Sequence, residues 1–146
     1  MKHKVMPNGT EYDFNDAGNV THEKCVDGAE YDYEYNDAGI LTHERWADGS
    51  VRDFDADGQM THTMYLDGAE RWYDSDGNVT HEKCADGTEY DYDHDTNGYL
   101  MHEKSTKGIE HWYDTAGHLT HQKLSDGTEY FYDEHGNCTQ LKDATK

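Results

Sequence analysis

Residues 8–25 decide the fold of this chain, and they read Asn8-Gly9-Thr10-Glu11-Tyr12-Asp13-Phe14-Asn15-Asp16-Ala17-Gly18-Asn19-Val20-Thr21-His22-Glu23-Lys24-Cys25. Two glycine-containing turns separate two short segments in which polar and apolar side chains alternate. The first turn is Asn-Gly, a strong hairpin signal because both residues tolerate the positive φ of a tight two-residue turn. The stretch predicts two strands, around Glu11–Phe14 and Val20–Cys25, that face each other across the second turn.

The same pattern recurs along the whole chain at intervals of 19 or 21 residues. Units begin at Asn8-Gly9, Asp27-Gly28, Asp48-Gly49, Asp67-Gly68, Asp86-Gly87, Lys107-Gly108 and Asp126-Gly127, and each holds two of the 14 glycines. The single proline, Pro7, precedes the array. The alternation of polar and apolar side chains and the fixed repeat spacing predict an all-β protein. The expected architecture is a repeat array of seven antiparallel β-hairpins forming one elongated, curled sheet.

The predicted array covers residues 8–142 as a single domain, with an N-terminal lead-in at 1–7 and a C-terminal tail at 143–146. The second and fifth units are two residues longer than the others, and the extra residues fall before the second glycine. We expect these insertions to lengthen that turn or to add a bulge, without disturbing the strands.

Two columns of apolar residues predict a buried row. They are Phe14, Tyr33, Phe54, Tyr73, Tyr92, Tyr113 and Tyr132, and Val20, Leu41, Met60, Val79, Leu100, Leu119 and Cys138. Strand alternation then pairs Tyr12 with His22, Tyr31 with His43 and Tyr90 with His102 on the same face. The other face is expected to carry Glu11 and Asp13 opposite Thr21 and Glu23, a negative surface whose like charges cost stability.

The charge restricts the class of partner. The 146 residues include 32 acidic and 12 basic side chains, a formal net charge of −20. This excludes binding of nucleic acid through a basic patch and disfavours anionic membranes, whereas it favours a cationic partner. The 12 tyrosines, 3 tryptophans and 3 phenylalanines argue against the disorder that such a composition otherwise indicates.

The N-terminal sequence and the cysteines indicate a cytoplasmic protein. Residues 1–7 lack the apolar stretch of a signal peptide, and no apolar run reaches transmembrane length. Three cysteines, Cys25, Cys84 and Cys138, are an odd number. Reduced thiols are therefore favoured over a disulfide.

A column of histidines is the first candidate site. It consists of His22, His43, His62, His81, His102 and His121. Equivalent positions two strands apart lie about 9.6 Å from one another, too far to share a metal ion. A Tyr–His ladder that completes the core is favoured, with metal binding and a pH-sensitive role as alternatives. No cofactor is expected.

Two other patterns have simpler interpretations. Asp55-Ala56-Asp57-Gly58 and Asp74-Ser75-Asp76-Gly77 resemble the start of a calcium loop but lack its closing glutamate, which favours ordinary turns. Histidine and carboxylate residues recur in every unit, whereas a catalytic site is singular. The sequence therefore predicts no catalytic residues and no enzymatic activity.

The repeated pattern resembles the YD repeat, also called the Rhs repeat. Clear instances are Tyr31-Asp32-Tyr33 leading to Gly39-Ile40-Leu41-Thr42, and residues 114–120. The resemblance covers residues 8–142 and implies β-hairpins joined into long, curling sheets, which form shells around toxic domains in large polymorphic-toxin proteins. Seven units are too few for such a shell. The resemblance therefore implies an accessory or immunity protein of a toxin system.

Aromatic residues that break the repeat mark the predicted partner-binding site. Where other units carry Asp13, Asp32, Asp53 and Asp91, three units carry Trp72, Trp112 and Phe131. Strand alternation is expected to place these residues, together with Trp46 and Tyr65, on the acidic face with Glu70, Glu110 and Glu129. Large aromatic side chains inside a charged rim are typical of protein interfaces, and packing of the sheet against itself or a second copy is the alternative.

These observations predict a non-enzymatic acidic binding protein. The expected partner is a basic bacterial protein toxin, with a nuclease favoured, which the protein would bind and occlude as an immunity protein or antitoxin. The predicted partner-binding residues are Trp72, Trp112, Phe131, Trp46, Tyr65, Glu70, Glu110, Asp53 and Asp91. A glycan- or cell-wall-binding module is one alternative, and a self-associating structural fragment of an Rhs-type shell is the other.

Overall fold

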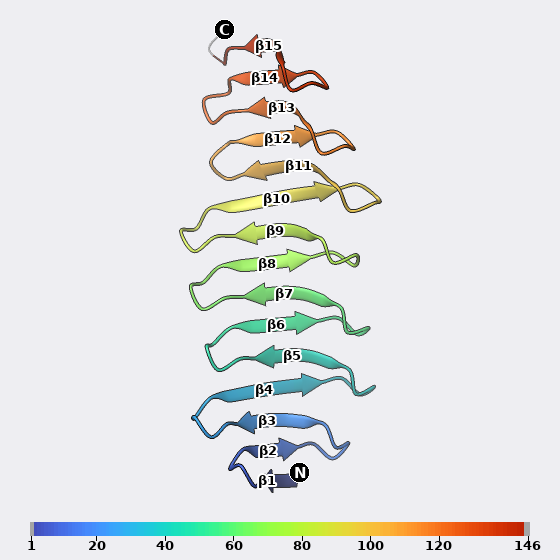
Figure 1. The fold of residues 1–146 in the computed structure, drawn as a ribbon, viewed down its shortest axis with the longest axis vertical. Helices are drawn as coiled ribbons and strands as arrows, with labels where there is room; N and C mark the ends of the chain where they lie inside the picture. Colours follow the sequence, from blue (N-terminus) through green and yellow to red (C-terminus); the bar gives the residue numbers. More distant parts are fainter. Residues whose placement is uncertain (1, 145–146) are drawn as a thin grey trace. The chain divides into compact units, whose positions relative to one another are not determined.

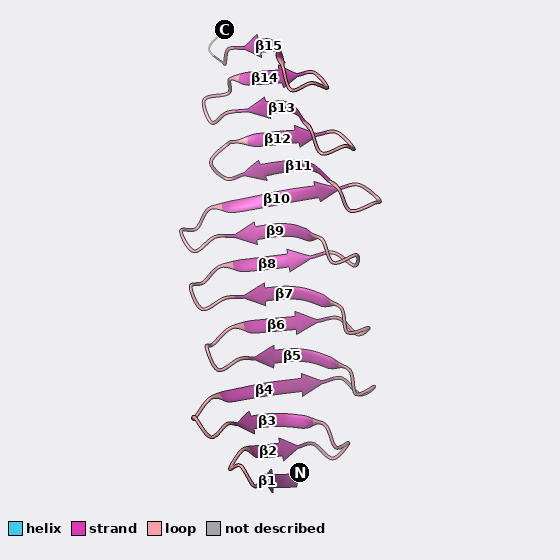
Figure 2. Cartoon of the chain, viewed as in Figure 1, coloured by secondary structure: helices cyan, strands magenta, loops and turns pink. Residues whose placement is uncertain are grey.

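The computed structural model describes residues 2–144, which contain fifteen β-strands and no helix (Figure 1, Figure 2). The strands are β1 (Lys2–Val5), β2 (Glu11–Phe14), β3 (Val20–Lys24), β4 (Glu30–Tyr35), β5 (Leu41–Arg45), β6 (Val51–Phe54), β7 (Met60–Met64), β8 (Glu70–Tyr73), β9 (Val79–Lys83), β10 (Glu89–His94), β11 (Leu100–Ser105), β12 (Glu110–Tyr113), β13 (Leu119–Lys123), β14 (Glu129–Tyr132) and β15 (Cys138–Lys142). The prediction of an all-β repeat array is confirmed. The predicted lead-in is not outside the sheet, because β1 pairs antiparallel with β2.

The chain divides into two compact units, residues 1–70 and 71–146. In unit 1, the strands from β1 to β7 pair antiparallel, each with the next in sequence. In unit 2, the strands from β9 to β15 do the same. Each unit is thus a meander whose neighbouring strands are also neighbours in sequence.

The turns are longer than the two-residue turns that the Asn-Gly and Asp-Gly dipeptides predict. In the turn after β3, Gly28 N–H donates to Cys25 O at 2.9 Å and Cys25 N–H donates to Ala29 O at 2.8 Å. In this turn only Gly28 has a positive φ, +88°. Among the described residues, every residue with a positive φ is a glycine. Asp27 instead accepts the Ala29 N–H through its carboxylate, so its role is side-chain capping of the turn.

A β-bulge changes which face each side chain occupies in the hairpins β2–β3, β4–β5, β6–β7, β10–β11, β12–β13 and β14–β15. Asp13 lies opposite His22 and Phe14 opposite Val20, so Thr21 has no partner in β2. Its hydroxyl donates to Asp13 O at 3.3 Å. The same threonine contact recurs at Thr42, Thr61, Thr80, Thr120 and Thr139. Because the bulge inserts one unpaired residue, Val20 and His22 lie on opposite faces although they are two residues apart.

The predicted Tyr–His pairing is therefore wrong. Tyr12 lies opposite Glu23, and its hydroxyl donates to a Glu23 carboxylate oxygen at 3.1 Å. Tyr31 and Tyr90 likewise lie opposite Glu23 and Glu82. We call the side that carries His22, Asp32, His43 and Asp53 in unit 1, and His81, Asp91, His102 and Trp112 in unit 2, the histidine face. The opposite side, with Tyr12, Glu23 and Tyr31 in unit 1 and Glu82, Tyr90 and Tyr92 in unit 2, is the tyrosine face.

The two-residue insertions lengthen strands, not turns. β4 and β10 have six residues, whereas β2, β6, β12 and β14 have four. As a consequence Tyr35 lies opposite Leu41 and His94 opposite Leu100, positions that the sequence assigned to Tyr33 and Tyr92.

Neither unit has a hydrophobic interior. Within residues 2–144 no hydrophobic side chain is buried, and the buried residues are Thr10, Glu44, Thr63, Thr88 and Ser105. The predicted buried row is only half-buried, and Cys138 at its end is exposed, because one layer of strands has no second layer to cover it. Stability must come from contacts between adjacent strands, as in other repeat proteins.

Candidate functional site

In unit 1, the middle of the histidine face is a row of alternating imidazoles and carboxylates. His22 Nδ1 lies 2.6 Å from Asp32 Oδ1, and His43 Nδ1 lies 2.6 Å from Asp53 Oδ1. Asp32 also accepts a hydrogen bond from Arg45 Nε at 3.1 Å. The hydrogen bonds from His22 and then Arg45 lower the pKa of Asp32 below its usual range.

Asp53 joins two histidines of this row. Its second oxygen lies 3.0 Å from His62 Nδ1, and His62 Nε2 lies 2.9 Å from Glu70 Oε2. Burial opposes charge on the imidazole, but the hydrogen bonds to Asp53 and Glu70 outweigh it and raise the pKa of His62. Burial likewise opposes the charge of Asp53, yet the bonds from His43 and His62 lower its pKa. These four groups form a continuous chain of titratable side chains.

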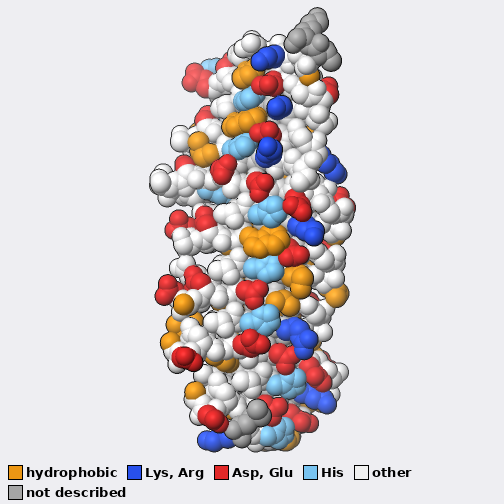
Figure 3. Space-filling model, turned by 180° about the vertical axis from the view of Figure 1, so that it is seen from behind, with side chains coloured by type: hydrophobic (Ala, Val, Ile, Leu, Met, Phe, Trp, Pro, Cys, Tyr) orange, Lys and Arg blue, Asp and Glu red, His pale blue; other side chains and the backbone are white. Residues whose placement is uncertain are grey.

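In unit 2, aromatic rings stand at the positions of two of the three aspartates in this row: Trp72 at that of Asp13 and Trp112 at that of Asp53. Trp112 stacks between His102 and His121, with ring centroids 4.7 and 4.1 Å away. Phe131 continues the stack on His121 at 4.2 Å. Glu110 and Glu129 fix the two imidazoles through Nε2, at 3.0 and 2.7 Å. Figure 3 shows one face of the molecule, on which histidine side chains recur between acidic and hydrophobic ones.

The remaining residues predicted on this face are placed as follows. Trp72 lies beside His81, with ring centroids 5.0 Å apart. Asp91 Oδ1 lies 2.6 Å from His81 Nδ1, and its side chain is 72% exposed. Trp72, Trp112, Phe131, Asp53, Asp91, Glu70 and Glu110 thus all lie on the histidine face of their own unit.

Trp46 and Tyr65 were predicted on that face as well, and for Trp46 this is wrong. Its indole N–H donates to Glu44 at 2.9 Å, its ring lies 6.1 Å from that of Tyr31, and the Arg52 guanidinium lies 4.4 Å above it. These partners belong to the tyrosine face. Tyr65 holds the equivalent position in the turn after β7, one residue beyond Met64. The bulge is again the cause, since it exchanges the faces of all the residues that follow it in the strand, Trp46 as well as His43.

The predicted like-charge pairs across strands are also absent from the described registers. Glu11 lies opposite Lys24, which in turn lies opposite Glu30. In unit 2, Lys104 lies between Glu110 and Asp91 in the same manner. The predicted loss of stability from like charges on opposite strands therefore gives no indication of function.

The charge of the histidine face differs between the units. In unit 1 it carries seven carboxylates, Glu11, Asp13, Glu30, Asp32, Glu34, Asp53 and Glu70, against Lys24 and Arg45. In unit 2 it carries five, Glu89, Asp91, Asp93, Glu110 and Glu129, against Lys83, Lys104, Lys123 and Lys142. Unit 1 therefore presents an acidic face and unit 2 a nearly balanced, aromatic one.

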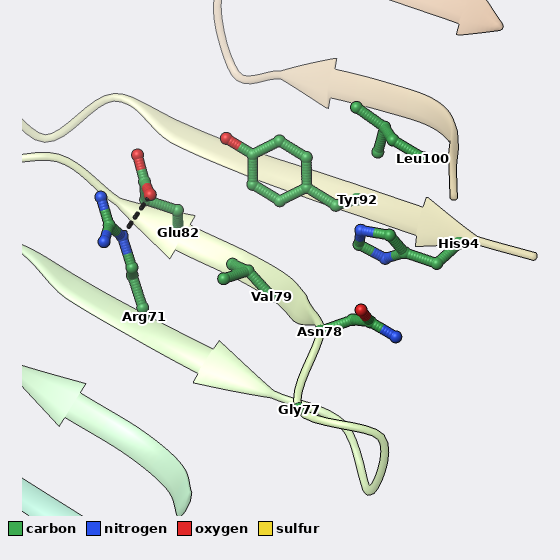
Figure 4. A pocket seen from close by; sticks show the side chains of 8 residues that line it. All are labelled: Arg71, Gly77, Asn78, Val79, Glu82, Tyr92, His94 and Leu100. Atoms are coloured by element: carbon green, nitrogen blue, oxygen red, sulfur yellow. Dashed lines mark hydrogen bonds and ion pairs between the residues drawn. The ribbon is translucent and has the colours of Figure 1, made fainter. Parts of the chain in front are cut away.

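The tyrosine face of unit 2 has a pocket that the sequence did not predict. It has a volume of about 410 Å³. Arg71, Gly77, Asn78, Val79, Glu82, Tyr92, His94 and Leu100 line it (Figure 4). Arg71 Nε donates to Glu82 at 2.7 Å. Burial, together with the charges of Glu82 and Glu103, raises the pKa of Tyr92 to about 12, so its phenol is neutral at physiological pH.

Within residues 2–144, no group of three or more histidine, cysteine or acidic side chains is arranged to hold a metal ion. The motifs that resemble calcium loops are turns in which Asp55 accepts the N–H groups of Asp57 and Gln59, and Asp74 those of Asp76 and Asn78. The described residues also include no helix long and apolar enough to cross a membrane.

Comparison with known families identifies part of the repeat. The RHS Repeat family model matches residues 113–146. The resemblance to Rhs repeats is confirmed for this segment, which includes β13, β14 and β15. No curated protein sequence matches the chain.

Several solved structures are similar to the chain. The SAS-4 TCP domain of Drosophila melanogaster, solved with a proline-rich motif of Ana2, is 15% identical, with a TM-score of 0.44 over 99% of this chain and 90% of that one. The TCP10 domain of Danio rerio CPAP is 15% identical, with a TM-score of 0.36 over 98% and 99%. A Photorhabdus luminescens Tc holotoxin pore chain is 15% identical, with a TM-score of 0.39 over 91% of this chain and 9% of that one.

Proposed function

We propose that this protein is a non-enzymatic binding protein whose acidic surface holds a basic protein partner. The observation that carries the proposal is the histidine face of unit 1, which bears seven carboxylates against two basic residues and has no layer of chain over it. The whole chain has a net charge of −20. Charge of this size accelerates encounter with a cationic partner and makes the rate of association salt-dependent.

The hydrogen bonds within this face prepare it for such a partner. Asp32 and Asp53 have lowered pKa values, so they stay ionised well below neutral pH. Their neighbours hold them at fixed positions, which reduces the entropy lost on binding. Glu34, opposite His43, adds a carboxylate to the same row.

The partner that best fits this chemistry is a basic bacterial toxin, with a nuclease favoured, and the role is that of a cytoplasmic immunity protein. Nucleases need basic surfaces for phosphate, and the carboxylates of unit 1 would occupy the places of phosphate oxygens. The Rhs-type repeat in residues 113–146 supports an origin in a toxin system.

The test is a pull-down from the native host, with bound proteins identified by mass spectrometry at about 50 and 150 mM salt, a range over which weak ionic contacts are screened. The wild type is compared with D32N/E34Q/D53N and with the matched unit 2 variant D91N/D93N/W112F, each checked for folding by circular dichroism. One basic protein should bind the wild type at both salt concentrations. It should not bind the unit 1 variant, and it should still bind the unit 2 variant. Retention of no protein at 150 mM salt would refute the binding function.

A second assay addresses the toxin specifically. The retained protein is tested for nuclease activity with and without an equimolar amount of this chain. Loss of that activity on mixing supports the immunity role. A retained basic protein that cleaves no nucleic acid supports the binding function but excludes a nuclease as the partner.

A fragment of an Rhs-type shell is the second candidate, and one observation favours it. All five residues of β15 are exposed, and this strand lies in the segment that matches the Rhs repeat. An exposed edge strand is a template for pairing with another strand. Concentration-dependent self-association in sedimentation, without a heterologous partner, would favour the shell over the inhibitor.

A further inference from the structure

The pocket of unit 2 arises at two departures from the internal repeat. Each of its residues has a counterpart 59 positions earlier, as Arg71 has Tyr12 and His94 has Tyr35. Six of the eight counterparts are identical: Gly18, Asn19, Val20, Glu23, Tyr33 and Leu41 stand where unit 2 has Gly77, Asn78, Val79, Glu82, Tyr92 and Leu100. Only the two tyrosines differ. Unit 2 therefore has an arginine and a histidine where unit 1 has two phenol rings, and the other six positions are the same.

Both replacements keep the position of the residue they replace. Tyr12 donates to Glu23 at 3.1 Å, and Arg71 donates to the equivalent Glu82 at 2.7 Å. Tyr35 lies opposite Leu41, and His94 lies opposite Leu100. The backbone is thus held in the same register while the side chains leave a space of about 410 Å³, within the range of small-molecule sites.

His94 has a ring nitrogen whose hydrogen-bonding capacity is not satisfied. Its Nδ1 is buried and has no hydrogen-bond partner. A buried polar atom without a hydrogen-bond partner destabilises the fold. In Figure 4 the imidazole lies among Tyr92, Leu100 and Asn78, at the rim of the pocket. A hydroxyl on a bound ligand can donate or accept, so it suits either tautomer once the imidazole turns toward it.

We propose that this pocket binds a neutral phenolic ring, as a free phenol or as the side chain of a tyrosine. In unit 2 the bound ring would stand where unit 1 has the rings of Tyr12 and Tyr35. Val79, Leu100 and the ring of Tyr92 supply the apolar walls. The Arg71 guanidinium, fixed by Glu82, supplies a flat cation that stacks on aromatic faces.

The same surroundings select against charged ligands. The net charge of −20 and the carboxylate of Glu82 repel an anion such as a benzoate, and the Arg71 guanidinium in the lining repels a cation. A plain hydrocarbon ring would leave His94 Nδ1 without a partner. The ligand should therefore be aromatic, uncharged and hydroxylated.

The test is a titration with 4-methylphenol, followed by NMR of side-chain methyl and histidine ring signals and by calorimetry. The wild type should bind one equivalent with a Kd near 1 mM or below, as expected for a ligand of about eight heavy atoms. Signals of Val79, Leu100 and His94 should shift. Toluene and 4-hydroxybenzoate should bind at least about tenfold more weakly.

Reciprocal variants give matched controls. H94Y and R71Y restore the residues of unit 1 and should each weaken binding about tenfold or more, with unchanged circular dichroism. Y12R/Y35H copies unit 2 into unit 1 and should raise the stoichiometry from one to two. Because this variant gains binding, loss of folding cannot imitate its result.

N-acetyltyrosinamide distinguishes the two sources of the ring. Affinity equal to that of 4-methylphenol indicates a tyrosine side chain, and affinity about tenfold weaker indicates a free phenol. The proposal is overturned if 4-methylphenol does not saturate the wild type by about 10 mM. It is also overturned if H94Y and R71Y bind as the wild type does, or if Y12R/Y35H adds no second site.

Discussion

The two units carry the same repeat and fill the middle row of the histidine face differently. At positions 59 residues apart, His22 and His81 correspond, and so do His62 and His121, but Asp13 and Asp53 correspond to Trp72 and Trp112. In unit 1 a carboxylate links His43 to His62 through both of its oxygens. In unit 2 a ring stacks between His102 and His121.

Histidine is therefore the adaptable member of this row. Its Nδ1–H donates to an aspartate carboxylate, and its flat ring stacks next to a tryptophan. Nε2 meets the same glutamate position in both units, Glu70 for His62 and Glu129 for His121. One backbone can therefore display either charge or aromatic surface without a change of register.

The largest effect is expected where the rings stack. Trp112→Ala removes the ring between two imidazoles and should lower the free energy of unfolding by about 2 kcal/mol, from lost apolar contact and lost stacking. Urea unfolding followed by circular dichroism measures this loss. Trp112→Phe should recover at least half of it, and D53A, at the matched position of unit 1, should cost less than W112A. Equal costs for W112A and D53A would contradict the comparison.

A smaller effect is expected at a pair of matched aspartates. Asp32 and Asp91 both lie 2.6 Å from a histidine, but Asp32 also accepts from Arg45 and is 35% exposed, against 72% for Asp91. D32N should lower unfolding free energy by about 1 kcal/mol, reduced by solvent screening, and D91N should leave it nearly unchanged. The same urea experiment checks both, and a D91N effect as large as that of D32N would be incompatible with this explanation.

The contribution of His62 should depend on pH in a defined direction. Its pKa in the folded chain is raised above the ordinary 6.5, so its stabilisation is complete below pH 6.5 and is lost as the pH rises through the raised value. With a side chain 21% exposed, the difference in stability between wild type and H62Q should be about 0.5 kcal/mol at pH 5.5 and smaller at pH 9. Unfolding curves at both values test this, and a difference that grows with pH would reverse the assigned sign.

The smallest effect is expected from salt. At about 1 M NaCl the screening length falls to roughly 3 Å, so the loss caused by D32N should shrink by about half. The loss caused by W112A should remain, because ring stacking is not an interaction between net charges. Unfolding of both variants at low and high salt compares the two, and a W112A loss that fell in parallel with that of D32N would remove the distinction between the units.

The repeat spacing was enough to predict strands and turns, because glycine positions and strand-type alternation are local properties. The faces were not predictable from alternation alone. Thr21 carries no signal that it is the bulged residue, since threonine is also a common strand residue. Once it is unpaired, His22 moves to the side of Asp13, and Glu23 moves to the side of Tyr12. The histidine–carboxylate row and the true place of Trp46 both follow from that single residue.

The residues around the pocket were overlooked for a different reason. Arg71 and His94 are ordinary residues for an exposed strand, and only their tyrosine counterparts 59 positions earlier make them unusual. Comparison of the two halves of the sequence, position by position, carries the signal for both Arg71 and His94.

The extended strands β4 and β10 impose a rule on how such a gene can change in length. Each is two residues longer than its counterparts, and side chains in a strand alternate with a period of two. An insertion of two codons therefore preserves the face of every following side chain, whereas an insertion or deletion of one codon within a strand exchanges the two faces downstream. Unit lengths of 19 and 21 obey this parity, and a unit of 20 residues would need a second bulge to be tolerated.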